Sequence, residues 1–287
     1  MKYSRLIAGT MTWGSWGKQL SKKGMETLMN FCISNNITTF DHADIYGAYT
    51  TEAEFGKALK NSSIDREAIQ LISKCGIQLL SDNRSNVVKH YNYSKEHIIQ
   101  SVETSLKNLE TEYLDLLLLH RPSPLMAAED IAEAITLLKK DGKIRDFGVS
   151  NFTPSQMEMI GLRMDIDVNQ IEFSLTEHSA MYNSTLDYMT TNGIKPMAWS
   201  PLGTVFKEDH EQNRRIHKQL GELIKKYNAT EDQLLLAWIM KHPSGIHPVI
   251  GTTTEKRLQL ATEATKIEIE IEDWFLILTA AQGHEVP

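Results

Sequence analysis

The chain is poor in cysteine and has no long apolar run. Only two cysteines, Cys32 and Cys75, occur among 287 residues, which is too few for a disulfide framework. The most apolar stretch, residues 274–281, is far shorter than the roughly 18 residues that a membrane-spanning helix needs. The N-terminal residues contain no apolar segment of signal-peptide length. We therefore expect a soluble protein of the reducing cytoplasm, with no membrane partner.

Positive charge is also in short supply. The sequence has 30 lysines and arginines against 37 aspartates and glutamates, a formal net charge of −7. This balance argues against a broad surface for nucleic acid or an anionic membrane. The hydrophobic share of 41% and the charged share of 23% are those of a soluble globular protein, which excludes disordered and fibrous classes.

No low-complexity tract or Pro/Gly/Ser-rich linker divides the sequence. The length would allow two average domains, but an α/β barrel of roughly 250 residues forms one domain. We therefore expect a single domain over residues 1–287, and a monomer is consistent with the sequence.

Three well-defined ligand motifs are missing. The sequence contains no Gly-x-Gly-x-x-Gly, the dinucleotide fingerprint of the Rossmann fold. Gly9 and Gly14 have the spacing of a P-loop, but Ser15-Trp16 follows instead of Lys-Ser/Thr, so that motif fails. His42 and Asp44 have no companion ligand cluster, whereas a metal site needs three or four converging ligands. We expect no metal, and a metal-dependent hydrolase remains a distant alternative.

A repeated two-part unit fills the chain instead. In each unit a short β-rich run ends in a polar residue, and an amphipathic stretch follows. Several runs, such as 116–119, are continuously apolar, which suits a parallel strand buried on both faces. This alternation favours a single-domain (β/α)8 TIM barrel, and a doubly wound open sheet is the alternative. The expected strands are residues 6–9, 38–41, 70–74, 114–120, 146–150, 169–173, 195–200 and 248–251.

Capping signals mark several of the helices between these strands. Ser94 precedes an apolar stripe as an expected N-cap, and Thr153-Pro154 places proline at the first helical position. Thr230 and Gln233 have the spacing of a capping box. The segments 76–93 and 202–212 are polar and without clear period, and long loops of this kind in a barrel are usually functional.

The expected strand ends carry mostly ionisable or hydrogen-bonding residues. Chemistry in a barrel takes place at the C-terminal ends of its strands, so these side chains are predicted to surround one site. Tyr46 follows the second strand end by five residues. In chain order the residues are Asp41, Lys74, His120, Ser150, Asn151, Gln170, Trp199, Ser200, Gly251 and Thr252.

Four of these side chains form a plausible acid catalyst when taken together. A phenol with a pKa near 10 is a poor acid at neutral pH unless a cation stabilises the phenolate. Lys74 supplies a cation for Tyr46, Asp41 can orient Lys74, and His120 can hold a carbonyl oxygen. Taken alone, Tyr46 fits packing and Lys74 a solvated charge better than catalysis, whereas Asp41 and His120 fit a structural role equally well. The set predicts protonation of a developing alkoxide during hydride reduction of a carbonyl.

Seven motifs carry a resemblance to a known family over nearly the whole chain. In order and spacing they resemble the aldo-keto reductase family, in particular its compact bacterial branch. The resemblance implies a (β/α)8 barrel that binds NADPH or NADP in an extended form without a Rossmann fold. The matching segments are residues 40–47, 72–75, 114–122, 148–152, 169–173, 199–203 and 249–252.

The resemblance also implies roles for individual residues. Tyr46 would be the general acid, with its pKa lowered by Lys74; Asp41 would pair with the lysine, and His120 would orient the carbonyl. The remaining positions imply a cofactor site in three parts. Ser150, Asn151 and Gln170 would hold the nicotinamide carboxamide and Trp199 would stack on its ring; Ser200, Leu202 and Gly203 would line the pyrophosphate; Thr252, Lys256 and Arg257 would meet the 2′-phosphate.

Two departures from the family pattern fall at the adenine end. Gly251 stands where many relatives have a basic residue, and Leu260-Ala261 replaces a Glu-Asn pair. Arg257 alone still favours NADPH over NADH, because guanidinium pairs well with phosphate.

The substrate side of the site is predicted from aromatic residues. Trp13 and Trp16 follow the first strand as expected pocket walls, with Tyr49 and Phe173 as further candidates. The leading hypothesis is an NADPH-dependent enzyme that reduces a small-molecule aldehyde or ketone. The alternative is an NADPH-binding regulatory or sensing subunit with little turnover.

Overall fold

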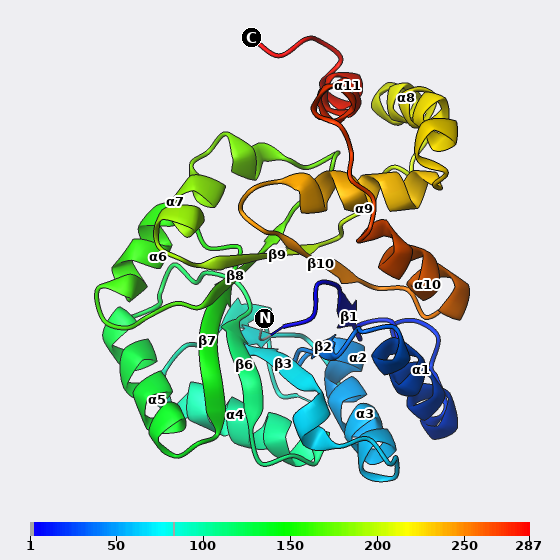
Figure 1. Cartoon of the computed structure of the whole chain (residues 1–287). Coiled ribbons are helices and arrows are strands. Elements are labelled where there is room, and N and C mark those ends of the chain that lie inside the picture. Colours follow the sequence, from blue (N-terminus) through cyan, green and yellow to red (C-terminus); the bar gives the residue numbers. More distant parts are fainter. Residues whose placement is uncertain (1–2, 83) are drawn as a thin grey trace.

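Eight parallel strands form a closed barrel surrounded by helices (Figure 1). The computed structural model describes residues 3–82 and 84–287. The strands hydrogen-bond in the order β1-β10-β9-β8-β7-β6-β3-β2, so the predicted barrel is confirmed over the open sheet. The strands are β1 (Ile7–Gly9), β2 (Thr39–Asp41), β3 (Gln70–Cys75), β6 (Leu114–Leu119), β7 (Ile144–Ser150), β8 (Val168–Glu172), β9 (Lys195–Trp199) and β10 (His247–Ile250).

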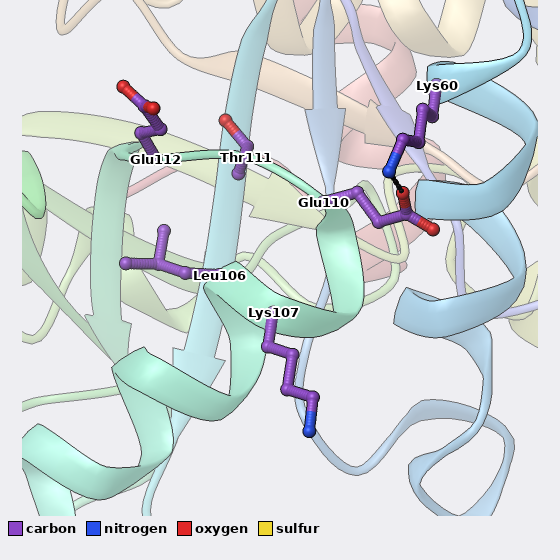
Figure 2. A pocket seen from close by; sticks show the side chains of 6 residues that line it. All are labelled: Lys60, Leu106, Lys107, Glu110, Thr111 and Glu112. Carbon is purple, nitrogen blue, oxygen red and sulfur yellow. Dashed lines mark ion pairs between the residues drawn. The ribbon is translucent and has the colours of Figure 1, made fainter.

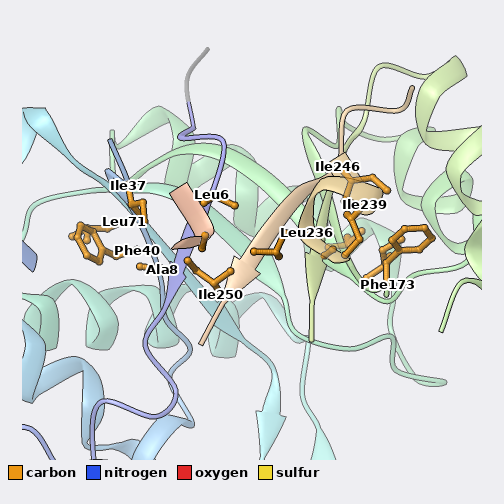
Figure 3. Packing of buried hydrophobic residues seen from close by; sticks show 14 of the residues in the cluster. Leu6, Ala8, Ile37, Phe40, Leu71, Phe173, Leu236, Ile239, Ile246 and Ile250 are labelled. Carbon is orange, nitrogen blue, oxygen red and sulfur yellow. The ribbon is translucent and has the colours of Figure 1, made fainter. Parts of the chain in front are cut away.

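The strands coincide with the expected runs to within about two residues. Every residue of β6 is buried, which explains the apolar run of residues 116–119; the one charged residue of the strand, Asp115, is also buried. Side chains alternate between two cores, as the period of a strand requires. Ile7 and Ile72 belong to a cluster inside the barrel, whereas Ala8 and Leu71 pack in the outer core between strands and helices (Figure 3).

Helices form the outer layer of the barrel (Figure 1). Helices α8 and α11 pack against each other at its periphery. Two short 3-10 turns, η1 (Arg66–Ala68) and η2 (Ser179–Met181), also occur. The helices are α1 (Lys22–Ser34), α2 (Tyr46–Tyr49), α3 (Thr51–Lys60), α4 (Lys95–Leu109), α5 (Ala128–Lys140), α6 (Pro154–Gly161), α7 (Thr185–Thr191), α8 (Glu211–Tyr227), α9 (Glu231–Lys241), α10 (Glu255–Ala264) and α11 (Ile271–Gln282).

The predicted caps begin these helices. The Ser94 side chain accepts a hydrogen bond from the His97 backbone N–H, and a capping box starts α6 at Thr153. At α9 the Gln233 side chain accepts a hydrogen bond from the Thr230 N–H. Each cap satisfies a backbone group that would otherwise lack a partner.

The two polar segments are more regular than expected. Residues 76–93 contain an antiparallel hairpin of β4 (Ile77–Gln78) and β5 (His90–Tyr91). In the segment 202–212, residues 202–207 form turns, residues 208–210 are irregular, and α8 begins at Glu211. Among residues 3–82 and 84–287, no helix has the length and apolar character needed to cross a membrane.

Candidate active site at the C-terminal ends of the strands

The Lys74 ammonium group lies at the centre of the predicted catalytic set. Its Nζ donates to Asp41 Oδ2 at 2.7 Å, to Tyr46 Oη at 3.1 Å and to the His42 carbonyl oxygen at 2.8 Å. Asp41 ends β2, Lys74 lies in β3, and Tyr46 begins α2, which follows β2 in the chain. All three ammonium donors are therefore in use, and they fix the phenol beside a cation.

The carboxylate of Asp41 is held from two sides. Its second oxygen, Oδ1, accepts a hydrogen bond from Gln170 Nε2 at 2.9 Å. Asp41 and Lys74 are only 2% and 1% exposed. A buried ion pair of this kind loses its solvation, and it is tolerated only when further hydrogen bonds satisfy the charges. Gln170 and His42 supply those bonds, so the pair is rigidly positioned.

Burial and charge act in opposite directions on the two proton-carrying groups. Burial raises the pKa of Tyr46, while Lys74 acts to lower it and Asp41 to raise it. Burial acts to lower the pKa of Lys74, but attraction to Asp41 and Tyr46 outweighs it and leaves that pKa raised. Lys74 therefore stays a cation and Tyr46 stays a neutral phenol at physiological pH. The expectation that Lys74 lowers the pKa of Tyr46 holds for the lysine's own contribution but not for the net shift.

His120 follows β6 and faces the phenol. Its ring centroid lies 6.1 Å from that of Tyr46, edge to face. Burial lowers the pKa of His120 well below its usual value, and the charges of Lys74, Arg121 and Lys89 lower it further. Its Nδ1 is buried and has no hydrogen-bond partner in the described part of the chain. The imidazole is thus neutral and has an unused polar atom.

The residues expected around the nicotinamide form one chain of hydrogen bonds. Ser150 Oγ donates to the Gln170 carbonyl oxygen at 2.9 Å, and Asn151 Nδ2 donates to Ser150 Oγ at 2.8 Å. Trp199 Nε1 donates to Asn151 Oδ1 at 3.1 Å. The ends of β7, β8 and β9 are therefore joined beside the Asp41–Lys74 pair. The amide of Gln170, however, already binds Asp41.

The segment expected at the pyrophosphate turns sharply after β9. Ser200 and Gly203 both have positive φ, at 54° and 53°, and Leu202 lies between them, half-buried. A Cβ on Gly203 would lie 2.0 Å from Thr176 Oγ1 and 2.6 Å from Ser174 Oγ. Only glycine fits there, because the turn packs directly on the loop after β8.

The segment expected at the 2′-phosphate lies between β10 and α10. Thr252 is half-buried, while Lys256 and Arg257 are exposed in the first turn of the helix. The start of a helix is partially positive, and the two cations add to its attraction for an anion, while Glu255 in the same turn opposes it. Gly251 is exposed, and a Cβ built there meets nothing within 4 Å. Packing would therefore allow a larger, basic residue at this position, and it does not explain why glycine occurs here.

The aromatic candidates occupy two different environments. Trp16 is 44% exposed and its ring centroid lies 6.3 Å from that of Tyr46, so Trp16 stays a candidate for the pocket wall. Trp13 is 1% exposed and packs on Phe40 and Phe55. This corrects the expectation for Trp13, whose ring is directed into the core.

Phe173 and Tyr49 are also engaged in packing. Phe173 is fully buried and stacks on Trp238 at 6.1 Å, which removes it from the candidate pocket wall. Tyr49 Oη accepts a hydrogen bond from the Leu79 N–H at 2.9 Å, and Arg84 lies over its ring.

One charged residue at this rim was not predicted from the sequence. Arg121 directly follows His120, and its Cζ lies 5.1 Å from the centroid of the Trp199 ring. Its position next to a strand-end histidine was the only available signal, because a single arginine in a loop is usually a surface residue. Its charge acts on both Tyr46 and His120.

A shallow hollow of about 580 Å³ lies elsewhere (Figure 2). It is lined by the ends of α3 and α4 and by the loop before β6, at the N-terminal end of the strands. An exposed ion pair, Lys60 to Glu110 at 2.8 Å, borders it (Figure 2). This hollow faces away from the polar strand ends.

A closed (β/α)8 barrel with a buried Asp–Lys pair beside a tyrosine at its C-terminal rim has the arrangement of a barrel enzyme, with its polar groups at the C-terminal ends of the strands. The chain belongs to the aldo-keto reductase family, because the profile of the Aldo/keto reductase family matches residues 5–280. Members of this family are oxidoreductases that generally use nicotinamide cofactors.

Individual relatives match the chain over nearly its whole length. It is 43% identical to the uncharacterized oxidoreductase YcsN of Bacillus subtilis, with 100% of this chain and 97% of that protein covered. It is 35% identical to a 6-dehydroglucose reductase of Agrobacterium fabrum, with 100% and 97% covered. The structure of the thermostable aldo-keto reductase Tm1743 in complex with the inhibitor epalrestat superimposes with a TM-score of 0.81, at 26% identity, with 96% and 94% covered.

Proposed function

We propose that this chain is an NADPH-dependent reductase of aldehydes or ketones, with Tyr46 as the proton donor. Family membership supports an oxidoreductase. The observation that carries the finer proposal is the contact of 3.1 Å between Lys74 Nζ and Tyr46 Oη, inside the bonded set with Asp41. We also propose that the whole chain forms one domain.

The donor chemistry of the rim fits a nicotinamide dinucleotide. Ser150, Asn151 and Trp199 offer polar atoms and an aromatic face for a nicotinamide carboxamide and its ring. Lys256 and Arg257 offer cations for a 2′-phosphate, and they form no ion pair within the described residues. When bound, NADPH supplies the hydride for carbonyl reduction.

The chain's own residues handle the oxygen and the proton. The neutral imidazole of His120 donates a hydrogen bond to the carbonyl oxygen and orients it. As negative charge develops on that oxygen, Tyr46 Oη passes its proton to it. Lys74 stabilises the resulting phenolate, because its cation is already placed and needs no rearrangement. Asp41 and Gln170 keep the lysine in position throughout.

Steady-state oxidation of NADPH against a panel of aldehydes and ketones tests this proposal. We expect turnover with at least one group of carbonyl compounds. Tight binding of NADPH without turnover of any compound would instead support a regulatory or sensing role.

The preference for NADPH is tested at Arg257. We expect Arg257→Ala to raise the KM for NADPH roughly tenfold, since one charge-assisted contact to phosphate is lost, and to leave the KM for NADH almost unchanged. Lys266→Ala, an exposed cation beyond the end of α10, is the matched control. Equal effects of Arg257→Ala on both cofactors would remove Arg257 from the phosphate site.

A further inference from the structure

Arg121 has a rigid backbone at the rim of the barrel. Tyr93 Oη accepts a hydrogen bond from the Arg121 N–H at 3.1 Å and donates one to the Arg121 carbonyl oxygen at 2.5 Å. Tyr93 is 5% exposed. It fits because Gly76, with a φ of 109°, has no side chain: a Cβ there would lie 2.0 Å from the Tyr93 ring. The direction in which the Arg121 side chain leaves the backbone is therefore fixed.

The guanidinium group of Arg121 has no polar partner in the part of the chain that the structure describes. Its Cζ lies 5.1 Å from the centroid of the Trp199 ring, which is a weak interaction for a charged group. Within residues 3–82 and 84–287 it forms no hydrogen bond and no ion pair. Arg66, by contrast, donates to Asp115 and to two backbone carbonyl oxygens. The five N–H donors of Arg121 are thus available to a ligand.

The charges around His120 are predominantly positive. Besides burial, the influences that lower the pKa of His120 are the cations Lys74, Arg121 and Lys89. Lys74 is already neutralised by Asp41 at 2.7 Å. Glu172 lies exposed at the end of β8, and burial and the charge of Glu177 raise its pKa while Arg121 acts to lower it. Glu172 and Arg121 form no ion pair. A carbonyl compound held at His120 therefore meets an excess of positive charge on the Arg121 side.

We propose that Arg121 selects carbonyl substrates that carry a carboxylate, so that the substrates of this enzyme are oxo acids. The guanidinium fork matches a carboxylate with two parallel hydrogen bonds. Arg121 immediately follows His120, so a carboxylate bound to the guanidinium would belong to the same small molecule as a carbonyl held at His120. This inference rests on the proposed function, because it names the substrate class of the same site.

A matched pair of four-carbon aldehydes tests the proposal. The measured quantity is the ratio of kcat/KM for 4-oxobutanoate to that for butanal. We expect the wild type to favour the acid and Arg121→Gln to lower the ratio about 10- to 150-fold, the effect of losing hydrogen bonds to a charged group. Arg121→Lys, which keeps the charge but not the fork, should give a ratio between the two.

Two controls separate this role from others. Arg145 lies over the Tyr113 ring at 3.8 Å at the opposite end of the barrel, so Arg145→Gln should leave the ratio unchanged. The Kd for NADPH, followed by tryptophan fluorescence, should change less than about threefold in Arg121→Gln. A rise in that Kd with an unchanged ratio would assign Arg121 to the cofactor and overturn the proposal.

Binding of butanoate gives a readout without turnover. Butanoate cannot be reduced, and calorimetry should show weaker binding to Arg121→Gln than to the wild type, with butanamide as the neutral comparison. Equal binding of butanoate to both proteins would overturn the proposal about Arg121. Loss of butanoate binding in Arg121→Gln, together with no turnover of any carbonyl by the wild type, would contradict the proposed function alone.

Discussion

The two ends of the barrel hold similar charged groups in different ways. At the N-terminal end, Asp115 is 2% exposed and pairs with Arg66 at 2.8 Å and Arg145 at 3.4 Å. At the C-terminal end, Asp41 is equally buried and pairs with Lys74 at 2.7 Å. The two sites use the same interaction, a buried carboxylate with a cation. They differ in what surrounds the pair.

The charged groups of the N-terminal end are paired with one another. Asp115 also accepts a hydrogen bond from the Leu71 N–H, and Arg66 and Arg145 both lie over the Tyr113 ring. Tyr3 donates a hydrogen bond to the carboxylate of Asp146. Burial, and then this hydrogen bond, raise the pKa of Tyr3. These hydrogen-bonding and stacking contacts involve only the protein, so this network contributes to stability.

The C-terminal end contains polar groups that have no hydrogen-bond partner among the described residues. His120 Nδ1 is buried without a partner, and the Arg121 guanidinium meets only an aromatic ring within the described residues. An unsatisfied buried polar atom costs free energy in the absence of a ligand. At the N-terminal end Tyr113 Oη is likewise buried without a partner in the described residues, but there both arginines are paired with Asp115. The comparison teaches that an imidazole and a guanidinium without polar partners, more than burial or charge, distinguish the functional end of this barrel.

The largest expected effect is at Tyr46. Tyr46→Phe removes the proton donor and keeps the ring, so kcat for carbonyl reduction should fall roughly 10²- to 10⁴-fold, the usual contribution of general acid catalysis. The Kd for NADPH should remain close to that of the wild type. Stopped-flow kinetics and a fluorescence titration measure the two quantities. A variant with near wild-type kcat would show that Tyr46 is not the donor.

The second largest effect is expected on stability, at the N-terminal end of the barrel. Asp115→Asn leaves Arg66 and Arg145 without their carboxylate. We expect the free energy of unfolding to fall by about 2–3 kcal/mol, less than for fully buried pairs because both arginines are partly exposed. Urea denaturation followed by circular dichroism measures this change. The kcat/KM of the folded enzyme should stay within about twofold. A large loss of kcat/KM without loss of stability would contradict the separation of the two ends.

A third prediction concerns acid. Burial, and then the charge of Lys74, lower the pKa of His42 to about 3. The unfolded chain binds this proton near pH 6.5, whereas the folded chain does not until about pH 3. Stability contributed here is therefore complete above about pH 6.5 and is lost as the pH falls toward 3.

The matching experiment compares pH dependences. Between pH 6 and 4, His42→Asn should remove about 1.4 kcal/mol per pH unit from the slope of unfolding free energy against pH. Urea denaturation at several pH values gives both slopes. Identical slopes for the variant and the wild type would mean that His42 is protonated in the folded protein.

The smallest effect is expected at the shallow hollow near the N-terminal ends of the strands. Lys60→Ala removes an exposed ion pair with Glu110, and solvent screening makes such pairs contribute little. We expect no measurable change in Tm or in kcat/KM. A clear loss of activity would mean that the hollow of Figure 2 takes part in function.

Much of the fold was predictable because strands and caps leave local signals. The apolar run in β6 could be recognised in the sequence together with His120, which follows the strand. The N-caps Ser94 and Thr153 could be recognised as well. The short hairpin β4–β5 could not, because two-residue strands have no periodicity. The catalytic set was predictable as a group because each member ends or follows a strand.

Side-chain directions were harder to predict. Trp13 and Trp16 are three residues apart, yet one lies in the core and the other at the rim. Gln170 was expected at the nicotinamide, but its amide binds Asp41. Arg121 is a candidate binding residue because its guanidinium has no hydrogen-bond or ion-pair partner among the described residues. Such facts depend on the packing of distant segments, and a local pattern does not contain them.

The hydrogen bond from Gln170 to Asp41 joins residues 129 positions apart. A growing chain that has emerged only as far as β6 already contains Asp41, Tyr46, Lys74 and His120. It still lacks the amide that holds the second carboxylate oxygen. We therefore expect catalytic competence to appear late in synthesis, only after β8 has joined the sheet. Enzyme activity would then report that the sheet has formed at least as far as β8, two strands before β10 closes the barrel on β1.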